Sequence, residues 1–269
     1  MKALLPPVTI SEHEGVRYLH LGSIWVQGAM RIATPHYVDL DYAQRMLAGL
    51  LWLPTAALGQ GHAVQLGLGA GALTRFTQHQ LGMRTTVVEL NQLVVMVCRH
   101  WFHLQTNDPR LKVVVMDAAR WLRKRAPPQS VQLLHVDLYD HEAAAPVLDD
   151  AGFYADCHHA LAEGGVMSVN LFGRHASFAA SAARVASVFG ADQVWSLRPT
   201  REGNTALIAT RGVVVPGRAE LTARAVAIEK RFGHLGLKAK KWLHWVRPYR
   251  AEEAAAAADN AHTMMEPRA

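Results

Sequence analysis

Short apolar runs alternate with helical patterns through the middle of this chain. We expect buried strands at residues 63–66, 85–88, 113–116, 131–136 and 166–171, with helices in the segments between them. Strands that alternate with helices form a mainly parallel sheet joined by right-handed crossovers. The sequence therefore predicts an α/β, Rossmann-like fold in which helices flank a mostly parallel sheet.

The segments before and after this alternation follow other patterns. Residues 8–32 alternate in short bursts separated by glycines, which is typical of a small antiparallel β-ribbon. Asp39 or Asp41 can cap a helix that reaches about residue 51, and residues 193–197 and 206–210 are expected to be antiparallel strands. We predict a β-ribbon domain over residues 1–40, a Rossmann-like domain over 41–212, and a basic extension and tail over 213–269.

Composition limits the classes of protein. The 28 Lys and Arg exceed the 22 Asp and Glu, for a net charge of +6, but the excess lies near the chain ends, so nucleic-acid binding is not required. Cys98 and Cys157 lie in apolar helical patterns, which predicts two buried thiols and neither a disulfide framework nor a cysteine zinc site. No His, Asp and Glu spacing indicates a metal site. Without a leader pattern or a run of about 20 apolar residues, we expect no membrane span and a cytoplasmic location.

A basic segment near the end of the chain contains two tryptophans. It could be a surface for nucleic acid or an acidic partner. It could also be a solvated cationic face whose tryptophans pack on the domain, and we favour this second interpretation. The segment comprises Lys238, Lys240, Lys241, Trp242, Trp245, Arg247 and Arg250.

A glycine loop follows the first strand of the alternation. Gly67, Gly69 and Gly71 allow a tight turn and the close approach of a ligand to the main chain. Glu89 ends the next strand, 18 residues after Gly71, where a carboxylate grips a ribose diol. NAD would use the same pair, but the loop lacks the third-glycine spacing of the dinucleotide fingerprint.

Carboxylates also end the third and fourth strands. Asp117 can accept a hydrogen bond from the adenine amine while the N–H of Ala118 reaches a ring nitrogen, and Asp117 can cap its helix as well. Asp137 and Asp140 follow the fourth strand, where such a pair would attract an amine and could take its proton. The pattern predicts an enzyme of the S-adenosylmethionine type, with residues 41–212 as a nucleoside-binding catalytic domain.

The chain resembles the spermidine synthase (polyamine aminopropyltransferase) family over roughly residues 9–210. The matching pieces stand in family order and include the β-ribbon, which a plain methyltransferase need not have. They are residues 23–27 (SIWVQ), 41–46 (DYAQRM), 67–71 (GLGAG), 87–91 (VVELN), 115–121 (VMDAARW), 137–140 (DLYD) and 153–154 (FY). The resemblance implies a Rossmann-like methyltransferase fold with an N-terminal β domain, and a homodimer.

The resemblance also implies an activity and roles for residues. The family moves an aminopropyl group from decarboxylated S-adenosylmethionine to a diamine such as putrescine and releases methylthioadenosine. By this resemblance Glu89 holds the ribose and Asp117 with Ala118 holds the adenine. Gln27 lies over the nucleoside, and Asp137 deprotonates the attacking amine. Asp140 and Tyr42 anchor the amine acceptor.

Two departures keep other functions open. The family loop usually reads Gly-Gly-Gly-Asp-Gly-Gly. Its aspartate grips the donor amine and would repel the carboxylate of intact S-adenosylmethionine. This chain lacks that aspartate, and we place its position at Gly69. The family's Asp-Ser-Ser-Asp-Pro is reduced to Asp-Leu-Tyr-Asp-His at residues 137–141. The alternatives are an S-adenosylmethionine-dependent methyltransferase of an unknown small molecule and a nucleoside-binding relative without turnover.

Overall fold

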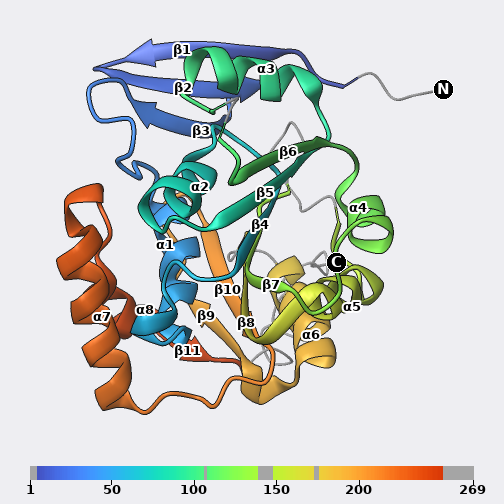
Figure 1. The fold of residues 1–269 in the computed structure, drawn as a ribbon, viewed down its shortest axis with the longest axis vertical. Coiled ribbons are helices and arrows are strands. Elements are labelled where there is room, and N and C mark those ends of the chain that lie inside the picture. The colour runs from blue at the N-terminus through green and yellow to red at the C-terminus, as the bar shows by residue number, and fades with distance from the viewer. Residues whose placement is uncertain (1–4, 106–107, 139–147, 173–175, 251–269) are drawn as a thin grey trace, which may run out of the picture.

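An eight-stranded sheet forms the centre of the molecule (Figure 1). The structure is a computed structural model, and it describes residues 5–105, 108–138, 148–172 and 176–250. The strand order is β11-β9-β10-β8-β7-β4-β5-β6, with β4 to β8 parallel and β9 to β11 antiparallel. The strands are β4 (His62–Leu66), β5 (Arg84–Glu89), β6 (Leu111–Val115), β7 (Val131–Val136), β8 (Leu161–Phe172), β9 (Val194–Leu197), β10 (Asn204–Thr210) and β11 (Val246–Pro248). The predicted mostly parallel sheet is confirmed.

Helices cover both faces of this sheet. One face carries α1 (Asp41–Met46) with the 3₁₀ segment η1 (Leu47–Trp52), α2 (Ala72–Arg75) with the π-helical segment η3 (Phe76–Gln80), α7 (Arg218–Phe232) and α8 (Ala239–Trp245). The other face carries α4 (Ala118–Lys124), α5 (Ala151–Ala160) and α6 (Ala176–Phe189). Short 3₁₀ turns lie at Thr55–Ala57, Ala191–Gln193 and Gly233–Leu235. Because both faces are covered, all five residues of β4 are buried.

A three-stranded antiparallel ribbon lies against one end of the sheet, as predicted. It consists of β1 (Val8–His13), β2 (Val16–Leu21) and β3 (Val26–Arg31). Its Leu19 and Met30 share a buried cluster with Val94 of α3 (Gln92–Trp101) and with Leu68 of the glycine loop. The ribbon therefore reaches the loop that follows β4, which places it above the carboxyl edge of the sheet (Figure 1).

One local prediction is wrong, and one predicted helix differs in type. Neither Asp39 nor Asp41 caps α1: the N-cap is Leu40, without a side-chain cap, and Asp41 instead pairs with Arg45 one turn later. The helix expected between the strands at 63–66 and 85–88 is present, but it is α-helical only to Arg75, after which the N–H of Leu81 bonds to the carbonyl of Phe76 in π-helical spacing. Tertiary packing of both segments decides their geometry, since most of their side chains are buried.

The segment beyond residue 212 packs on the main sheet. Ile228, Phe232 and Trp242 belong to the same buried cluster as Leu50 of η1, and β11 pairs with β9. Trp242 is 1% exposed. The ring of Trp245 lies 4.3 Å from the guanidinium carbon of Arg45, so the two tryptophans pack on the domain rather than project from it.

The domain boundaries at residues 40 and 212 stay predictions. Cys98 and Cys157 are buried and unpaired with each other, as expected. Within the part of the chain that the structure describes, no helix is long and apolar enough to cross a membrane.

Candidate functional site

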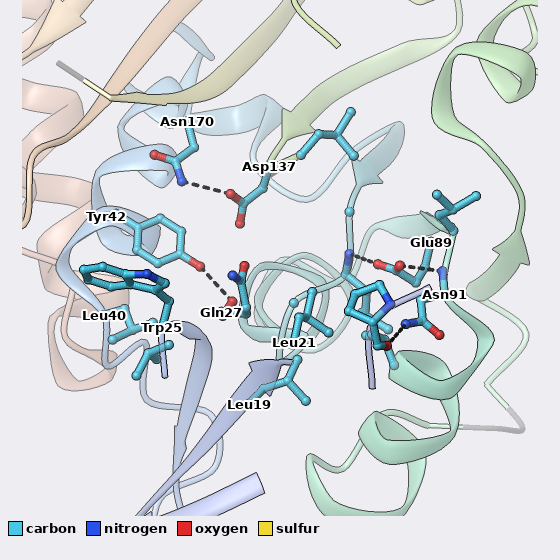
Figure 2. Close-up of a pocket in the computed structure, with 18 of the residues that line it drawn as sticks. Leu19, Leu21, Trp25, Gln27, Leu40, Tyr42, Glu89, Asn91, Asp137 and Asn170 are labelled. Atoms are coloured by element: carbon cyan, nitrogen blue, oxygen red, sulfur yellow. Dashed lines mark hydrogen bonds between the residues drawn. The ribbon is translucent and has the colours of Figure 1, made fainter. Parts of the chain in front are cut away.

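A cavity of about 870 Å³ lies at the carboxyl edge of the sheet, between the strand ends and the ribbon (Figure 2). Ends of parallel strands are where open α/β sheets bind ligands. Its wall combines residues from β2, β3, α1, the glycine loop and the ends of β5, β6 and β7. Among the predicted site residues, the wall includes Gln27, Tyr42, Gly67, Gly69, Glu89, Asp117, Ala118 and Asp137.

The glycine loop is shaped by close contacts. Gly67, Gly69 and Gly71 have φ of +84°, +51° and +72°, which other residues adopt only with strain. A Cβ on Gly67 would lie 2.1 Å from the carbonyl oxygen of Asp137, so a side chain there would separate the ends of β4 and β7. Gly71 does not line the cavity; it is the N-cap of α2. Its role as a direct ligand-binding residue therefore stays a prediction, while its position explains the turn into α2.

Glu89 is fixed by two backbone groups at the end of β5. Its Oε2 accepts the N–H of Leu68 at 2.9 Å and its Oε1 accepts the N–H of Asn91 at 2.8 Å. Burial raises the pKa of Glu89, and these N–H bonds lower it again. The carboxylate is thus held in one orientation beside the glycine loop, at the wall of the cavity.

Asn91 connects Glu89 to the N-terminal segment. Its Oδ1 accepts the N–H of Leu93 and caps α3, while its Nδ2 donates to the carbonyl of Pro6 at 3.2 Å. Leu5 and Pro6 line the cavity next to it. The N-terminal segment is therefore part of the wall, which the sequence did not reveal.

Asp117 has the predicted capping role. Its Oδ1 accepts the N–H of Arg120 at 2.7 Å at the start of α4. Capping uses one of its two oxygens, so a carboxylate oxygen is left for a ligand, and both Asp117 and Ala118 line the cavity.

Asp137 lies at the centre of a short amide network. Its Oδ1 accepts Nδ2 of Asn170 on β8 at 2.9 Å, and Oδ1 of Asn170 accepts Nδ2 of Asn204 on β10 at 3.2 Å. The second bond fixes the orientation of the Asn170 amide, so that its NH₂ faces Asp137. Burial raises the pKa of Asp137, and the hydrogen bond from Asn170 lowers it again.

Sequence reasoning missed Asn170 and Asn204, although both line the cavity. The signal for Asn170 was present, because it is a polar residue in an otherwise apolar run on the strand beside the one that ends at Asp137. Asn204 gave no such signal, since it follows a stretch that has the composition of a hairpin loop.

Tyr42 and Gln27 join the ribbon to α1. The hydroxyl of Tyr42 donates to the backbone carbonyl of Gln27 at 3.4 Å (Figure 2). In the same view Asp137 and Gln27 lie between Tyr42 at one end and Glu89 at the other. Tyr42 and Glu89, predicted to hold the acceptor and the ribose, therefore lie at opposite ends of one cavity. Asp140 lies outside the described residues.

The position given above for the missing loop aspartate is wrong by one residue. Counted from Gly67, the fourth residue of the six-residue family loop corresponds to Ala70, not Gly69. Ala70 is buried against β3, where a Cβ on Gly28 would lie 2.6 Å from the Ala70 Cβ. Ala70 and Gly28 are therefore packed too closely for a larger side chain, while the absence of a carboxylate in this loop stands.

The described wall of the cavity is acidic. It contains six carboxylates, Asp39, Asp41, Glu89, Asp117, Asp137 and Glu202, and no Lys, Arg or His. Outside the wall, Arg31 pairs with Asp39 and Arg45 pairs with Asp41, both at 2.6 Å. No group of three or more potential metal ligands occurs among the residues that the structure describes. The arrangement suits a cationic organic ligand.

Comparisons with known proteins agree on one family. The model of the spermine/spermidine synthase domain matches residues 63–207. A polyamine aminopropyltransferase of Neisseria meningitidis is 31% identical over 209 residues, which covers 77% of this chain and 77% of that protein. A probable spermidine synthase from Corynebacterium glutamicum has a similar fold, with a TM-score of 0.70 at 19% identity over 94% of this chain and 91% of that one.

The fold alone is shared more widely. Human methyltransferase-like protein 13, solved in complex with SAH, gives a TM-score of 0.63 at 21% identity over 72% of this chain and 93% of that one. The predicted methyltransferase-like fold is thus confirmed, and the sequence matches decide between the families. The chain belongs to the spermine/spermidine synthase family.

Proposed function

We propose that this protein is a transferase that moves an aminopropyl group from decarboxylated S-adenosylmethionine to an amine. The observation that carries this proposal is the charge of the cavity, whose described wall holds six carboxylates and no cationic side chain. A decarboxylated donor is wholly cationic, whereas intact S-adenosylmethionine adds a carboxylate that such a wall repels. Membership of the spermine/spermidine synthase family supports the same reaction.

The nucleoside end of the cavity would hold the donor. Glu89, fixed by two backbone N–H groups, would accept hydrogen bonds from the ribose hydroxyls. Asp117 and the N–H of Ala118 would hold the adenine, and Gln27 would lie over the nucleoside. The glycine loop lets the ligand approach the main chain, because Gly67 and Gly69 line the cavity and carry no side chain.

The transfer step needs a neutral amine and a base. The amine nitrogen forms a bond to the carbon attached to the sulfonium, the C–S bond breaks, and its electron pair stays on sulfur in methylthioadenosine. The proton of the amine passes to Asp137, with Tyr42 and Asp140 anchoring the acceptor. Alignment of amine and donor supplies much of the rate, and a positioned base contributes about 10² to 10⁴-fold.

Two alternatives remain as proposals of lower rank. A methyltransferase is favoured by the loop at Gly67–Gly71, which has no carboxylate to exclude intact S-adenosylmethionine. A nucleoside-binding relative without turnover would keep Glu89 and Asp117 and need no base. A homodimer and a cytoplasmic location also stay predictions, supported by the family resemblance and by two buried, unpaired thiols.

Calorimetric titration of the protein with three ligands tests the proposal. Decarboxylated S-adenosylmethionine and methylthioadenosine should bind at least about 10-fold more tightly than intact S-adenosylmethionine, because the acidic wall disfavours an added carboxylate. Tighter binding of the intact cofactor would favour the methyltransferase. Binding of methylthioadenosine without turnover of any donor would favour the non-catalytic relative.

The Asp137→Asn variant separates binding from chemistry. It should bind methylthioadenosine as the wild type does, but lose about 100-fold or more in kcat/KM, since it cannot take the proton. Glu89→Gln is the matched control, because it should weaken nucleoside binding instead. Full activity of Asp137→Asn would overturn the assignment of the base.

A further inference from the structure

The end of the cavity opposite Glu89 has an apolar rim. Three consecutive residues form it, namely Ile24 and Trp25 of the connection between β2 and β3 and Val26, the first residue of β3, and all three line the cavity. They are 88%, 57% and 41% exposed. Figure 2 shows Trp25 beside Tyr42 and Leu40, with Asp137 between this group and Glu89. A molecule whose amine reaches Asp137 therefore extends along apolar and aromatic surface.

The two carboxylates that the structure describes beside the rim are each paired with an arginine. Asp39 and Asp41 flank Leu40 in sequence and line the cavity, but each is held at 2.6 Å by an arginine, Arg31 and Arg45 respectively. A second ammonium on the acceptor would have to compete with these guanidinium groups. The other carboxylate of the wall away from the nucleoside, Glu202, is exposed, and water screens an ion pair there.

The rim has a defined backbone. The carbonyl of Trp25 lies 3.1 Å from Nδ1 of His20 on β2, and its N–H donates to the hydroxyl of Ser23 at 3.4 Å. Val26 then begins β3. These two hydrogen bonds hold the turn that carries the indole at the mouth of the cavity. A ligand that covers the exposed face of the indole removes apolar surface from water.

We propose that the amine acceptor carries an apolar or aromatic group, rather than a second ammonium as in a diamine, and that Trp25 determines this specificity. The inference rests on the proposed function. The acceptor nitrogen would attack the donor carbon and lose its proton to Asp137, with the C–S electron pair leaving on sulfur, while the apolar group stays on the rim. No group of the rim takes part in the bond changes.

An assay of methylthioadenosine release tests the inference. The donor is decarboxylated S-adenosylmethionine, and the acceptor is putrescine, butylamine or 2-phenylethylamine. We expect 2-phenylethylamine to exceed putrescine by about 10-fold in kcat/KM, as burial of its ring adds to binding. Trp25→Ala should raise the KM for 2-phenylethylamine by about 10-fold and leave kcat little changed. The KM for putrescine should change by no more than about two-fold. Trp101→Ala is the matched control, an exposed tryptophan outside the cavity wall.

Each other outcome overturns the inference in a recognisable way. Release with putrescine alone, or an equal effect of Trp25→Ala on all three amines, would contradict it and leave the proposed function standing. If the protein binds the donor but none of the amines causes release, the proposed function fails and the inference with it. If Trp25→Ala converts a dimer into a monomer in sedimentation, the rim is an interface between copies and not an acceptor site.

Discussion

At the scale of single residues, Asn170 lowers the pKa of Asp137. Its Nδ2 donates to Asp137 Oδ1 at 2.9 Å and lowers a pKa that burial raises. Asn170→Ala removes the donor, so the pKa of Asp137 rises further and the base is ionised only at higher pH. We expect the acidic limb of the kcat/KM profile to move up by about one pH unit, the size of one hydrogen bond to a charged group. A pH–rate profile measures it.

Asn204 supplies the control for this prediction. Asn204→Ala leaves the donor in place and removes only the bond that orients the Asn170 amide, so its shift should be smaller. A uniform loss of rate across all pH values in Asn170→Ala would mean that Asn170 supports packing and does not tune the base.

At the scale of elements, the contact between β3 and the glycine loop holds the cavity together. A Cβ on Gly28 would lie 2.5 Å from the backbone nitrogen of Ala70, and neither backbone can yield without moving Gln27 or Gly69. Gly28→Ala should therefore destabilise the fold by about 1–3 kcal/mol and weaken binding of methylthioadenosine. Urea unfolding and calorimetry measure the two effects. Gly233→Ala is the control: it has φ −59° and ordinary contacts, so we expect no loss.

The elements that sequence predicts best are those whose pattern is local. The strand at Val131–Val136 has the predicted bounds, and Asn91 and Asp117 cap their helices, because apolar runs and cap side chains act within a few residues. β8 begins five residues before the predicted strand. Its register against β7 shifts between Val131 and Leu133, and Gly164, with φ +73°, lies in the resulting bulge.

The candidate site divides in the same way. Strand ends are readable, so Glu89, Asp117 and Asp137 could be placed together from the alternation alone. The contributions of Pro6, Asn170 and Trp25 depend on chain segments that meet only in the folded molecule. Periodicity describes neighbours along one element and carries no information about which distant segment covers it.

At the scale of the whole molecule, buried histidines make stability depend on pH. Burial lowers the pKa of His62 and of His135 to about 4, from 6.5, so the folded state holds both neutral. Below pH 6.5 these histidines bind protons in the unfolded chain but stay neutral in the folded chain. The free energy of unfolding therefore falls as the pH drops from about 6.5 to 4. Each histidine should account for about 2–3 kcal/mol of that loss. The raised pKa values of Glu89 and Asp137 act in the opposite direction.

Urea unfolding at pH 4.5 and pH 7 checks this dependence. His135→Leu removes an imidazole with no partner for either ring nitrogen, so it should keep more stability at pH 4.5 and lose none at pH 7. The exposed His13→Gln should behave as the wild type does. An unchanged difference between the two pH values in His135→Leu would show that other groups cause the acid sensitivity.

The bond between Asn91 and the carbonyl of Pro6 has a practical consequence. Because Leu5 and Pro6 are themselves wall residues, a change in this segment alters the wall of the ligand chamber. Ligand titrations of a protein that carries an amino-terminal affinity tag should therefore be repeated after the tag has been removed.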